Sequence, residues 1–248
     1  MVPYRMGADF QRRLNAQAVL GWLSKLEIQI ILAEHSSEPD QDLVVPAGIR
    51  RIHVRSETGF NKAAACNAGF REAQASVVGF IDADMVLNPA ALLGCFKRVM
   101  LNDEVIRPFG SLVELSQVES AKYLQAGSLP AGDYSLRDDS RGSEHIPACG
   151  GAFVIRSERY LKAGGMDERF LGWGGEDNAF GMALDLIGSN SLLLKAEPAF
   201  HLWHQRTQAS RYEHENYEKN LELLSWWQAA TAETQKQWAD SVRPGLRN

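Results

Sequence analysis

Three groups of side chains in this chain could carry chemistry, and the first is the pair Asp82 and Asp84. The pair follows residues 76–81, an apolar run with the composition of a buried strand. Because residues two apart share one face of a strand, we expect both carboxylates to project together from the carboxyl end of the sheet. A divalent cation would relieve their repulsion and leave positions for phosphate oxygens. The alternative is a pair of solvated aspartates that cap the next helix.

The second group is the string G-W-G-G-E-D at residues 172–177. Two adjacent acids, Glu176 and Asp177, follow a glycine-rich turn and open a helix, whose N-terminus favours a charged carboxylate. One acid could serve as general base while the other holds a substrate hydroxyl. The flat face of Trp173 suits a sugar ring. The alternative is that both acids only complement the helix dipole.

The third group is His201-Leu202-Trp203-His204, whose spacing puts both imidazoles within one turn or loop. Neutral imidazole binds borderline cations such as Mn²⁺ or Zn²⁺. Two histidines alone slightly favour a structural role. Together with the aspartates they indicate a mixed Asp/His metal site.

Several weaker candidates also lie at expected carboxyl ends of strands or in the loops that follow. Arg5 leaves a first strand that contains Pro3 and Tyr4, and it could pair with a diphosphate while one of the other two contacts a flat base. The alternative is an edge strand with a solvated arginine. Glu34 could accept a hydrogen bond from a base or ribose, and Lys62 at the head of a helix could meet a phosphate.

The elements that must position these groups alternate between strands and helices in the first half. Strands are expected at 28–33, 52–54 and 76–81, and helices at 10–22, 61–73 and 89–100. This rhythm predicts a parallel sheet covered by helices. The second half is expected to contain a loop at 128–144, a strand at 152–155, helices at 157–163 and 178–187, and an amphipathic helical tail at 211–238.

Length and composition exclude several classes of protein. The 248 residues suit one large domain, and 26 Lys and Arg against 31 Asp and Glu give a net charge of −5, which disfavours nucleic acid as a partner. No run of 18 apolar residues and no signal-peptide pattern occurs. Cys66, Cys95 and Cys149 fit neither a disulfide framework nor a thiolate zinc site, so a reducing cytoplasm is expected.

Taken in order, these segments resemble metal-dependent glycosyltransferases of the GT-A fold. The matching segments are Phe60-Asn61-Lys62-Ala63, Asn67-Ala68-Gly69, Phe80-Ile81-Asp82-Ala83-Asp84, Gly150-Gly151, Gly172 to Asp177 and His201 to His204. The chain looks most like the β-1,4-galactosyltransferase group and its bacterial family 2 relatives, including chondroitin-type polymerase domains. The G-W-G-G-E-D string is the specific part of the match, because D-x-D is generic.

The resemblance implies an α/β fold of GT-A type, with a Rossmann-like mixed sheet flanked by helices and a C-terminal helical tail. It covers residues 1–210, with a nucleotide-binding half at 1–110 and an acceptor-binding half at 111–210. A helical extension at 211–248 would follow.

The resemblance also implies roles for individual residues. With Glu34 added from its position, the expected nucleotide-sugar contacts are Pro3, Tyr4, Arg5, Glu34, Lys62, Asp82, Gly150 and Gly151. Asp84 and His204 match metal ligands. His201 falls where galactosyltransferases carry a methionine ligand, which implies a harder site that is richer in nitrogen.

The G-W-G-G-E-D string supplies the remaining roles. Trp173 matches a tryptophan that covers the donor, and Glu176 matches an acid that binds the acceptor, which Trp173 is also expected to contact. Asp177 matches the catalytic base. The match of Asp177 implies inversion at the anomeric carbon, although retaining relatives share the D-x-D motif.

The expected function is transfer of a hexose or N-acetylhexosamine from a UDP-sugar to a saccharide or glycolipid acceptor, with Mn²⁺ or Mg²⁺ as cofactor. Surface polysaccharide or glycoconjugate synthesis would use such a bacterial enzyme, in the cytoplasm or at the inner face of the membrane. Ala148 and Cys149 stand where vertebrate galactosyltransferases carry a bulky Tyr-Phe, so we expect room for an N-acetyl group.

Two other classes of function remain open. A nucleotidyltransferase on a similar fold would carry a glycine-rich triphosphate loop near the N-terminus, where residues 1–13 hold only Gly7. A catalytically silent carbohydrate-binding domain is the other alternative, and the intact acidic pair and both histidines speak against it.

Overall fold

The computed structural model describes residues 1–5, 10–57, 59–102, 104–129, 136–137, 150–172, 174–193, 198–205 and 216–246. The elements of the first half are β1 (Val2–Tyr4), α1 (Phe10–Leu23), β2 (Ile31–Ser36), β3 (Arg50–Arg55), α2 (Lys62–Arg71), β4 (Val77–Ile81), β5 (Met85–Val86) and α3 (Pro89–Asn102). Those of the second half are β6 (Glu104–Arg107), β7 (Ser111–Glu114), α4 (Gln117–Ala126), β8 (Leu136–Arg137), β9 (Ala152–Arg156), α5 (Ser157–Ala163), α6 (Glu176–Leu186), β10 (Asn190–Leu193), β11 (Pro198–His201), α7 (Tyr217–Ala229), α8 (Ala232–Val242) and a short 3₁₀ helix (Arg243–Leu246).

The main sheet forms from two sets of strands that meet at the first residue of the chain. β1, β2 and β3 are parallel, and the second set has the order β10-β6-β9-β4, in which β9 is antiparallel to both neighbours. The Ile81 N–H donates to the Met1 carbonyl at 3.0 Å, which places β4 beside β1. A smaller sheet has the order β5-β11-β7-β8. The parallel sheet expected from the helix and strand rhythm is therefore correct only for part of the molecule, because an apolar run does not specify strand direction.

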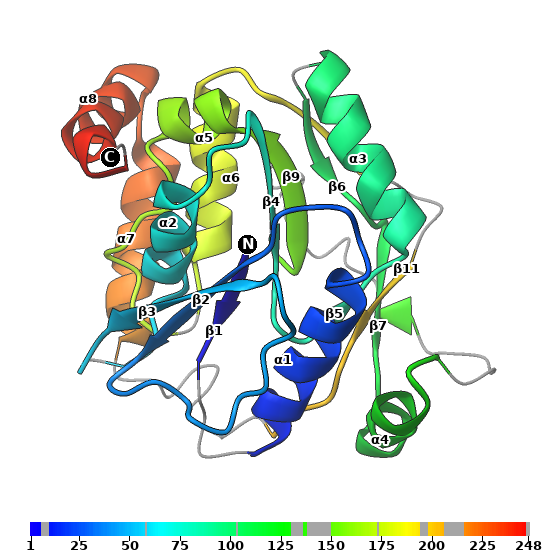
Figure 1. The fold of residues 1–248 in the computed structure, drawn as a ribbon. Coiled ribbons are helices and arrows are strands. Elements are labelled where there is room, and N and C mark those ends of the chain that lie inside the picture. Colours follow the sequence, from blue (N-terminus) through cyan, green and yellow to red (C-terminus); the bar gives the residue numbers. More distant parts are fainter. Residues whose placement is uncertain are drawn as a thin grey trace.

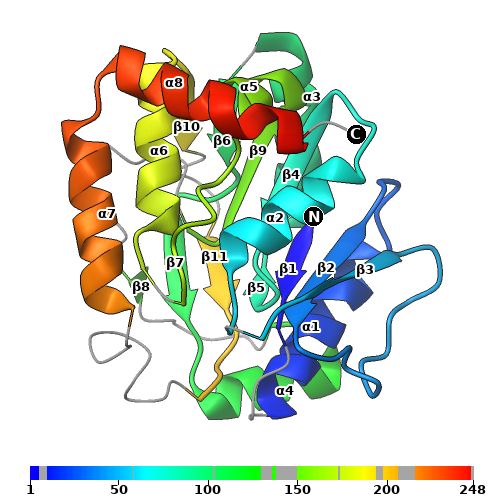
Figure 2. The same cartoon turned by 90° about the vertical axis from the view of Figure 1, so that its left-hand side faces the viewer.

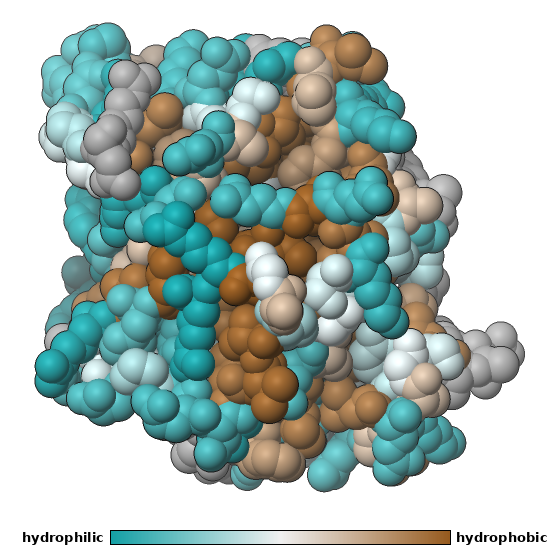
Figure 3. Space-filling view, in the orientation of Figure 1, coloured by the Kyte–Doolittle hydropathy of each residue, from teal (hydrophilic) through white to brown (hydrophobic). Residues whose placement is uncertain are grey.

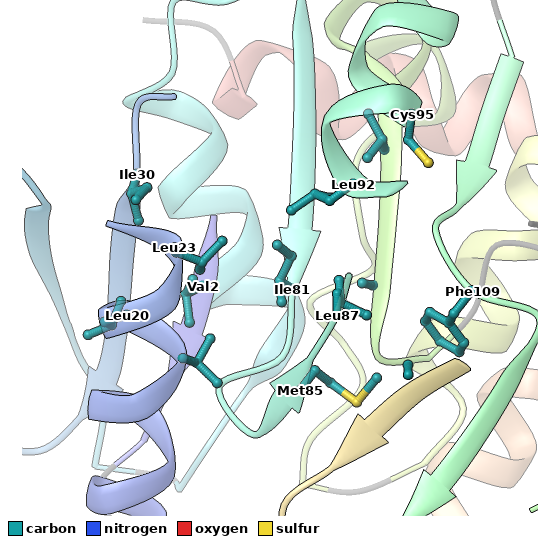
Figure 4. Packing of buried hydrophobic residues seen from close by; sticks show 14 of the residues in the cluster. Val2, Leu20, Leu23, Ile30, Ile81, Met85, Leu87, Leu92, Cys95 and Phe109 are labelled. Atoms are coloured by element: carbon teal, nitrogen blue, oxygen red, sulfur yellow. The ribbon is translucent and has the colours of Figure 1, made fainter. Parts of the chain in front are cut away.

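Side chains on the two faces of the buried strands pack in two separate hydrophobic cores. In β4, Val77 and Ile81 pack in the core with α1 and α3, whereas Val78 and Phe80 pack in the core with α2, α5 and α6. Figure 1 shows these helices on opposite sides of the strands, and Figure 4 shows side chains of the first core. Each fully buried side chain of this size stabilises the fold by about 1.5–3 kcal/mol relative to exposure.

Several elements differ from the sequence-based expectation. β2 begins at Ile31, three residues after the predicted start. The elements that were not predicted are β5, β6, β7, β10, β11 and α4. The expected tail helix is divided into α7 and α8. Thr231 begins α8 by accepting a hydrogen bond from the Thr234 N–H at 3.2 Å, which is a helix start signal inside the predicted helix. Most of the expected loop at 128–144 lies outside the described residues, but residues 136–137 form β8.

The two tail helices pack on the side of the sheet that carries α2, α5 and α6, and α8 crosses this layer in Figure 2. Trp227 of α7 is buried, and its Nε1 donates to Asp167 Oδ2 at 2.9 Å. Arg169 donates to the same carboxylate and lies over the Trp226 ring, 4.7 Å from its centroid. The tail is therefore part of the folded core.

No helix in the described ranges is both long enough and apolar enough to cross a membrane. On the face drawn in Figure 3, hydrophobic residues gather in the middle and hydrophilic residues surround them.

Candidate active site

The D-x-D acids lie in a turn between β4 and β5. The Met85 N–H donates to the Asp82 carbonyl at 3.1 Å, and the Asp82 N–H donates to the Gly151 carbonyl at 2.8 Å. The strand has ended at Ile81, so the expectation that both carboxylates share one strand face is wrong. The turn directs Asp82 and Asp84 to two different sets of partners.

Asp84 faces two histidines that come from the end of β11 and the residues after it. Its Oδ2 lies 3.5 Å from His201 Nε2 and 3.4 Å from His204 Nε2. The ligand atoms of these three residues all lie within 4.8 Å of one another. One carboxylate oxygen and two imidazole nitrogens form a donor set that fits Mn²⁺ or Zn²⁺, and all three side chains are less than one fifth exposed.

The charges of this trio are strongly coupled. Burial opposes a charge on Asp84, but His201 and His204 outweigh it and lower the pKa of the carboxyl. Burial likewise opposes a charge on His201, and the attraction of Asp84 outweighs it and raises the pKa of His201 to about 10. For His204, burial and the charge of Arg12 lower the pKa.

Asp82 faces Lys62, which joins it to the second acidic motif. Lys62 Nζ lies 3.1 Å from Asp82 Oδ1 and 3.0 Å from Asp177 Oδ2. Lys62 is the first residue of α2, which Asn61 caps by accepting a hydrogen bond from the Ala64 N–H. Because a helix N-terminus disfavours a cation, the two carboxylates are what hold the ammonium there. The N-termini of α2 and α6 therefore converge on one charged cluster.

Burial shapes the acidities in this cluster. It opposes a charge on Lys62, but Asp177 and Asp82 outweigh it and raise the pKa of the ammonium. Burial raises the pKa of Asp82 to about 6, with Lys62 opposing the shift. Burial and the neighbouring Asp177 raise the pKa of Glu176 to about 7. One carboxyl beside Asp177 can therefore hold a proton near neutral pH.

Glycines supply the backbone that leads into α6. Gly172, Gly174 and Gly175 have φ of 76°, 101° and 95°, a region that L side chains rarely adopt. A Cβ at Gly175 would also lie 2.6 Å from Phe170 Cε1. The turn therefore requires glycine, and it places Glu176 and Asp177 in the first turn of the helix. Trp173, the predicted donor cover, lies outside the described residues.

The two glycines before β9 also have positive φ, 76° at both Gly150 and Gly151. A Cβ at Gly151 would lie 2.8 Å from Met85 Cε and 3.2 Å from Phe109 Cζ, so a side chain here would have to displace these buried side chains. Ala148 and Cys149, on which the donor-size hypothesis depends, lie outside the described residues.

Of the predicted residues on β1 and after it, only Arg5 is partly exposed. It lies over the Phe60 ring at 5.4 Å, and burial and the charge of Arg12 lower its pKa to about 10 while Asp84 opposes the shift. Pro3 and Tyr4 are buried, and the Tyr4 hydroxyl donates to Asp40 Oδ2 at 2.7 Å. Pro3 and Tyr4 therefore anchor β1 in the fold, and Arg5 follows directly after this strand.

Glu34 has no exposed surface, and both of its carboxylate oxygens are already bonded. Oε1 accepts from the Asp40 N–H at 2.6 Å, and Oε2 accepts from Arg51 at 2.6 Å. The sequence placed Glu34 at the end of a strand, but the structure extends β2 to Ser36 and pairs Glu34 inside the sheet. We therefore assign Glu34 to the fold in place of the predicted nucleotide contact.

Sequence reasoning missed three residues near the trio. Glu114 Oε2 lies 3.2 Å from His201 Nδ1, and Trp203 lines the same cavity of about 450 Å³, which also includes both histidines. Arg12 of α1 acts electrostatically on Asp84, His204 and Arg5. Trp203 lies between the two histidines in the sequence, so its position near the trio could have been predicted. Glu114 and Arg12 reach the site only through the fold.

Comparisons with known proteins agree on the class of protein. The sequence model of a family described as "Glycosyltransferase like family 2" matches residues 24–225. A hyaluronan synthase from Pasteurella multocida is 24% identical over an alignment of 206 residues, and the match covers 70% of this chain and 21% of that protein. This chain thus spans about a fifth of the length of that relative.

Two solved structures share the fold. The catalytic domain of Drosophila β1,4-galactosyltransferase 7, determined with xylobiose, has a TM-score of 0.50 at 14% identity, covering 86% of this chain and 72% of that one. TarS from S. aureus has a TM-score of 0.61 at 12% identity, covering 99% of this chain and 42% of that one. The predicted α/β fold of GT-A type is confirmed.

Proposed function

Since this chain belongs to the family 2-like glycosyltransferases, we propose that it moves a hexose or N-acetylhexosamine from a UDP-sugar to a saccharide hydroxyl, with inversion and with a divalent metal. The observation that carries the proposal is that Lys62 contacts both Asp82 of the D-x-D turn and Asp177 of the second acidic motif. A candidate metal trio stands on one side of the D-x-D turn, and a candidate base stands on the other.

The metal side would bind the donor diphosphate. Asp84, His201 and His204 fit Mn²⁺, which when bound supplies Lewis-acid stabilisation of the departing UDP. Arg5 interacts electrostatically with Asp84, and its positive charge would add to the stabilisation of the phosphates. The net negative charge of the chain does not prevent binding of a diphosphate, because the charges next to the site determine that binding.

The acidic side would activate the acceptor. In our proposal Asp177 takes the proton from the acceptor hydroxyl, whose oxygen forms the new bond to the anomeric carbon. The bond between that carbon and the UDP oxygen breaks on the opposite face, and UDP leaves with the bonding electrons. Glu176, whose pKa is raised to about 7, can donate a hydrogen bond to the acceptor in its protonated form.

The glycine-rich turn would exclude water from this reaction. We propose that Trp173 and its flanking glycines close over the donor, which limits hydrolysis of the sugar nucleotide. Residues Ala148 and Cys149 would leave room for an N-acetyl group on the donor. Competition between UDP-Gal, UDP-GalNAc and UDP-GlcNAc tests this point, and strict preference for UDP-Gal contradicts it.

A screen of nucleotide sugars tests the proposed function. The chain is incubated with each donor and a panel of saccharide acceptors, with Mn²⁺ or with EDTA, and released UDP is measured. We expect Mn²⁺-dependent UDP release from at least one UDP-hexose or UDP-N-acetylhexosamine, with a product of inverted anomeric configuration. Pyrophosphate release from a nucleoside triphosphate would instead identify a nucleotidyltransferase. Metal-independent release, or a retained anomer, would contradict the proposal.

A further inference from the structure

Leu202 and Trp203, the two residues between the histidines, direct all four of their backbone polar groups at other elements. The Leu202 N–H donates to the Asp84 carbonyl at 2.8 Å, and the Trp203 N–H donates to Ser120 Oγ at 2.7 Å. The Asn15 side-chain amide donates to the Trp203 carbonyl at 3.0 Å and lies 3.5 Å from the Leu202 carbonyl. The D-x-D turn, α4 and α1 therefore hold this short segment from three directions.

Asn15 and Ser120 are unusual positions for polar side chains. Both lie within helices, and both have no exposed surface. A buried amide or hydroxyl destabilises the fold unless it is hydrogen-bonded, and both residue types are poorer helix formers than alanine. Gln11 Nε2 donates to Asn15 Oδ1 at 3.0 Å, which turns the Asn15 NH₂ group toward the segment.

The segment held in this way connects two of the three candidate metal ligands. His201 precedes Leu202 and His204 follows Trp203, while the Leu202 N–H is bonded to the residue that supplies the third ligand, Asp84. Leu202 is itself fully buried, so the segment is fixed by packing as well. Rotation of either peptide would move the imidazoles relative to the carboxylate. Groups that orient metal ligands commonly change metal affinity 10- to 100-fold.

We propose that Asn15 and Ser120 are positioning residues that fix the backbone between the two histidines and thereby set the affinity of the site for a divalent cation. The inference rests on the proposed metal centre. The Asn15 amide and the Ser120 hydroxyl bond the backbone of residues 202–203, and each acts on the candidate ligands through that backbone.

Titration with Mn²⁺, followed by electron paramagnetic resonance of the free ion, tests the proposal on the whole chain. The variants are Asn15→Ala and Ser120→Ala. Gln235→Ala is the matched control for the first, because Gln235 is 2% exposed and its amide donates to the Ala163 carbonyl at 3.2 Å, in the tail. Ser225→Ala is the control for the second, because Ser225 is a helical serine whose hydroxyl donates to the Leu221 carbonyl.

We expect each test variant to raise the Kd for Mn²⁺ about tenfold or more, while both controls stay within twofold of the wild type. Hydrogen exchange at residues 201–205 should accelerate in the test variants alone. Saturating Mn²⁺ should restore most of kcat, since neither residue reacts with substrate.

The outcomes distinguish a failure of the positioning role from a failure of the metal centre itself. An unchanged Kd in both folded test variants, with a lower Tm like that of Gln235→Ala, shows a role in folding alone and overturns the inference. If Asn15→Ala does not fold, Ser120→Ala decides the matter. Failure of the wild-type chain itself to bind Mn²⁺ would overturn the metal centre and the inference with it.

Discussion

Lys62 Nζ lies 3.0 Å from Asp177 Oδ2, although 115 positions separate the two residues in the sequence. The same ammonium reaches Asp82, so one cation joins the turn that would bind the donor to the acid that would activate the acceptor. A donor diphosphate would compete with both carboxylates for this ammonium. Lys62 is thus placed to respond to donor binding in the part of the site that we propose performs the chemistry.

Replacing Lys62 by Met leaves Asp82, Glu176 and Asp177 without their shared counter-ion. We expect kcat/KM to fall about 100-fold and stability to fall by about 1–2 kcal/mol, because these side chains are partly exposed and the full cost of an unpaired buried charge does not apply. Lys62→Arg should recover part of both losses. Steady-state kinetics and thermal unfolding measure them, with Lys97→Met on the exposed surface of α3 as control. Wild-type kinetics in Lys62→Met would remove the lysine from the site.

Replacing His204 by Ala removes one of two nitrogen ligands from the candidate trio. We expect the affinity for Mn²⁺ to fall about tenfold or more, because one carboxylate and one imidazole remain. The Kd from a Mn²⁺ titration measures this, and His53→Ala on exposed β3 serves as control. If the titration curve of His204→Ala matches that of the wild type, this residue does not belong to the metal site.

Glu176 makes the stability of the fold depend on pH in a defined direction. Its pKa is raised to about 7, so the folded chain keeps a proton that the unfolded chain loses near pH 4.5. Between these values the folded state binds more protons, and its stability falls as pH rises. Glu176→Gln removes this loss. We expect its Tm to exceed that of the wild type by about 2–4 °C at pH 8, and the two to converge near pH 5.

Thermal unfolding across pH 5–8 checks this difference. Glu222→Gln is the matched control, because Glu222 is exposed on α7, and its Tm should follow the wild type at every pH. A Glu176→Gln variant that shows no gain at pH 8 would mean that Glu176 is ionised at no cost in the folded chain.

Asn220 of α7 ties the tail to the glycine-rich turn. Its Nδ2 donates to the Leu171 carbonyl at 2.9 Å, its Oδ1 accepts from the Leu171 N–H at 3.3 Å, and it is 4% exposed. Asn220→Ala frees the residue that precedes Gly172. We expect kcat to fall about tenfold with a small change in the Kd for UDP. Gln235→Ala, which loosens α8 instead, should keep kcat within twofold; equal losses in both variants would show that tail stability alone is at work.

The sequence predicted those parts of the site that local patterns encode. The Gly172 to Asp177 string required a turn followed by a helix, and the structure has positive φ at three glycines and α6 beginning at Glu176. Asn61 before Lys62 is a helix start signal, and α2 begins there. Such signals depend on residues within one turn of each other, so a single sequence is sufficient to read them.

The parts of the site that the sequence did not predict depend on contacts between residues far apart in the chain. Glu34 belonged to the same expected sheet edge as Asp82, but Arg51 on the neighbouring strand pairs with it inside the sheet. Asn15 lay in an expected helix and Ser120 in a stretch with no expected element, and neither could be identified, because their partners are backbone groups 188 and 83 positions away. Asp82 and Asp84 share a motif and separate only because β4 ends at Ile81. The fold as a whole could be predicted from motif order, whereas these pairings needed three-dimensional contacts.

If Asp177 is the base of a metal-dependent sugar transfer, a paired measurement on Asp177→Asn must separate catalysis from nucleotide binding. In the presence of Mn²⁺, kcat for UDP release with acceptor and the Kd for UDP are measured on the variant and the wild type. Asparagine keeps the shape of the side chain but cannot take a proton, so we predict that kcat falls 10²- to 10⁴-fold while the Kd for UDP stays within about threefold. A variant that keeps near-wild-type kcat would show that Asp177 is not the base.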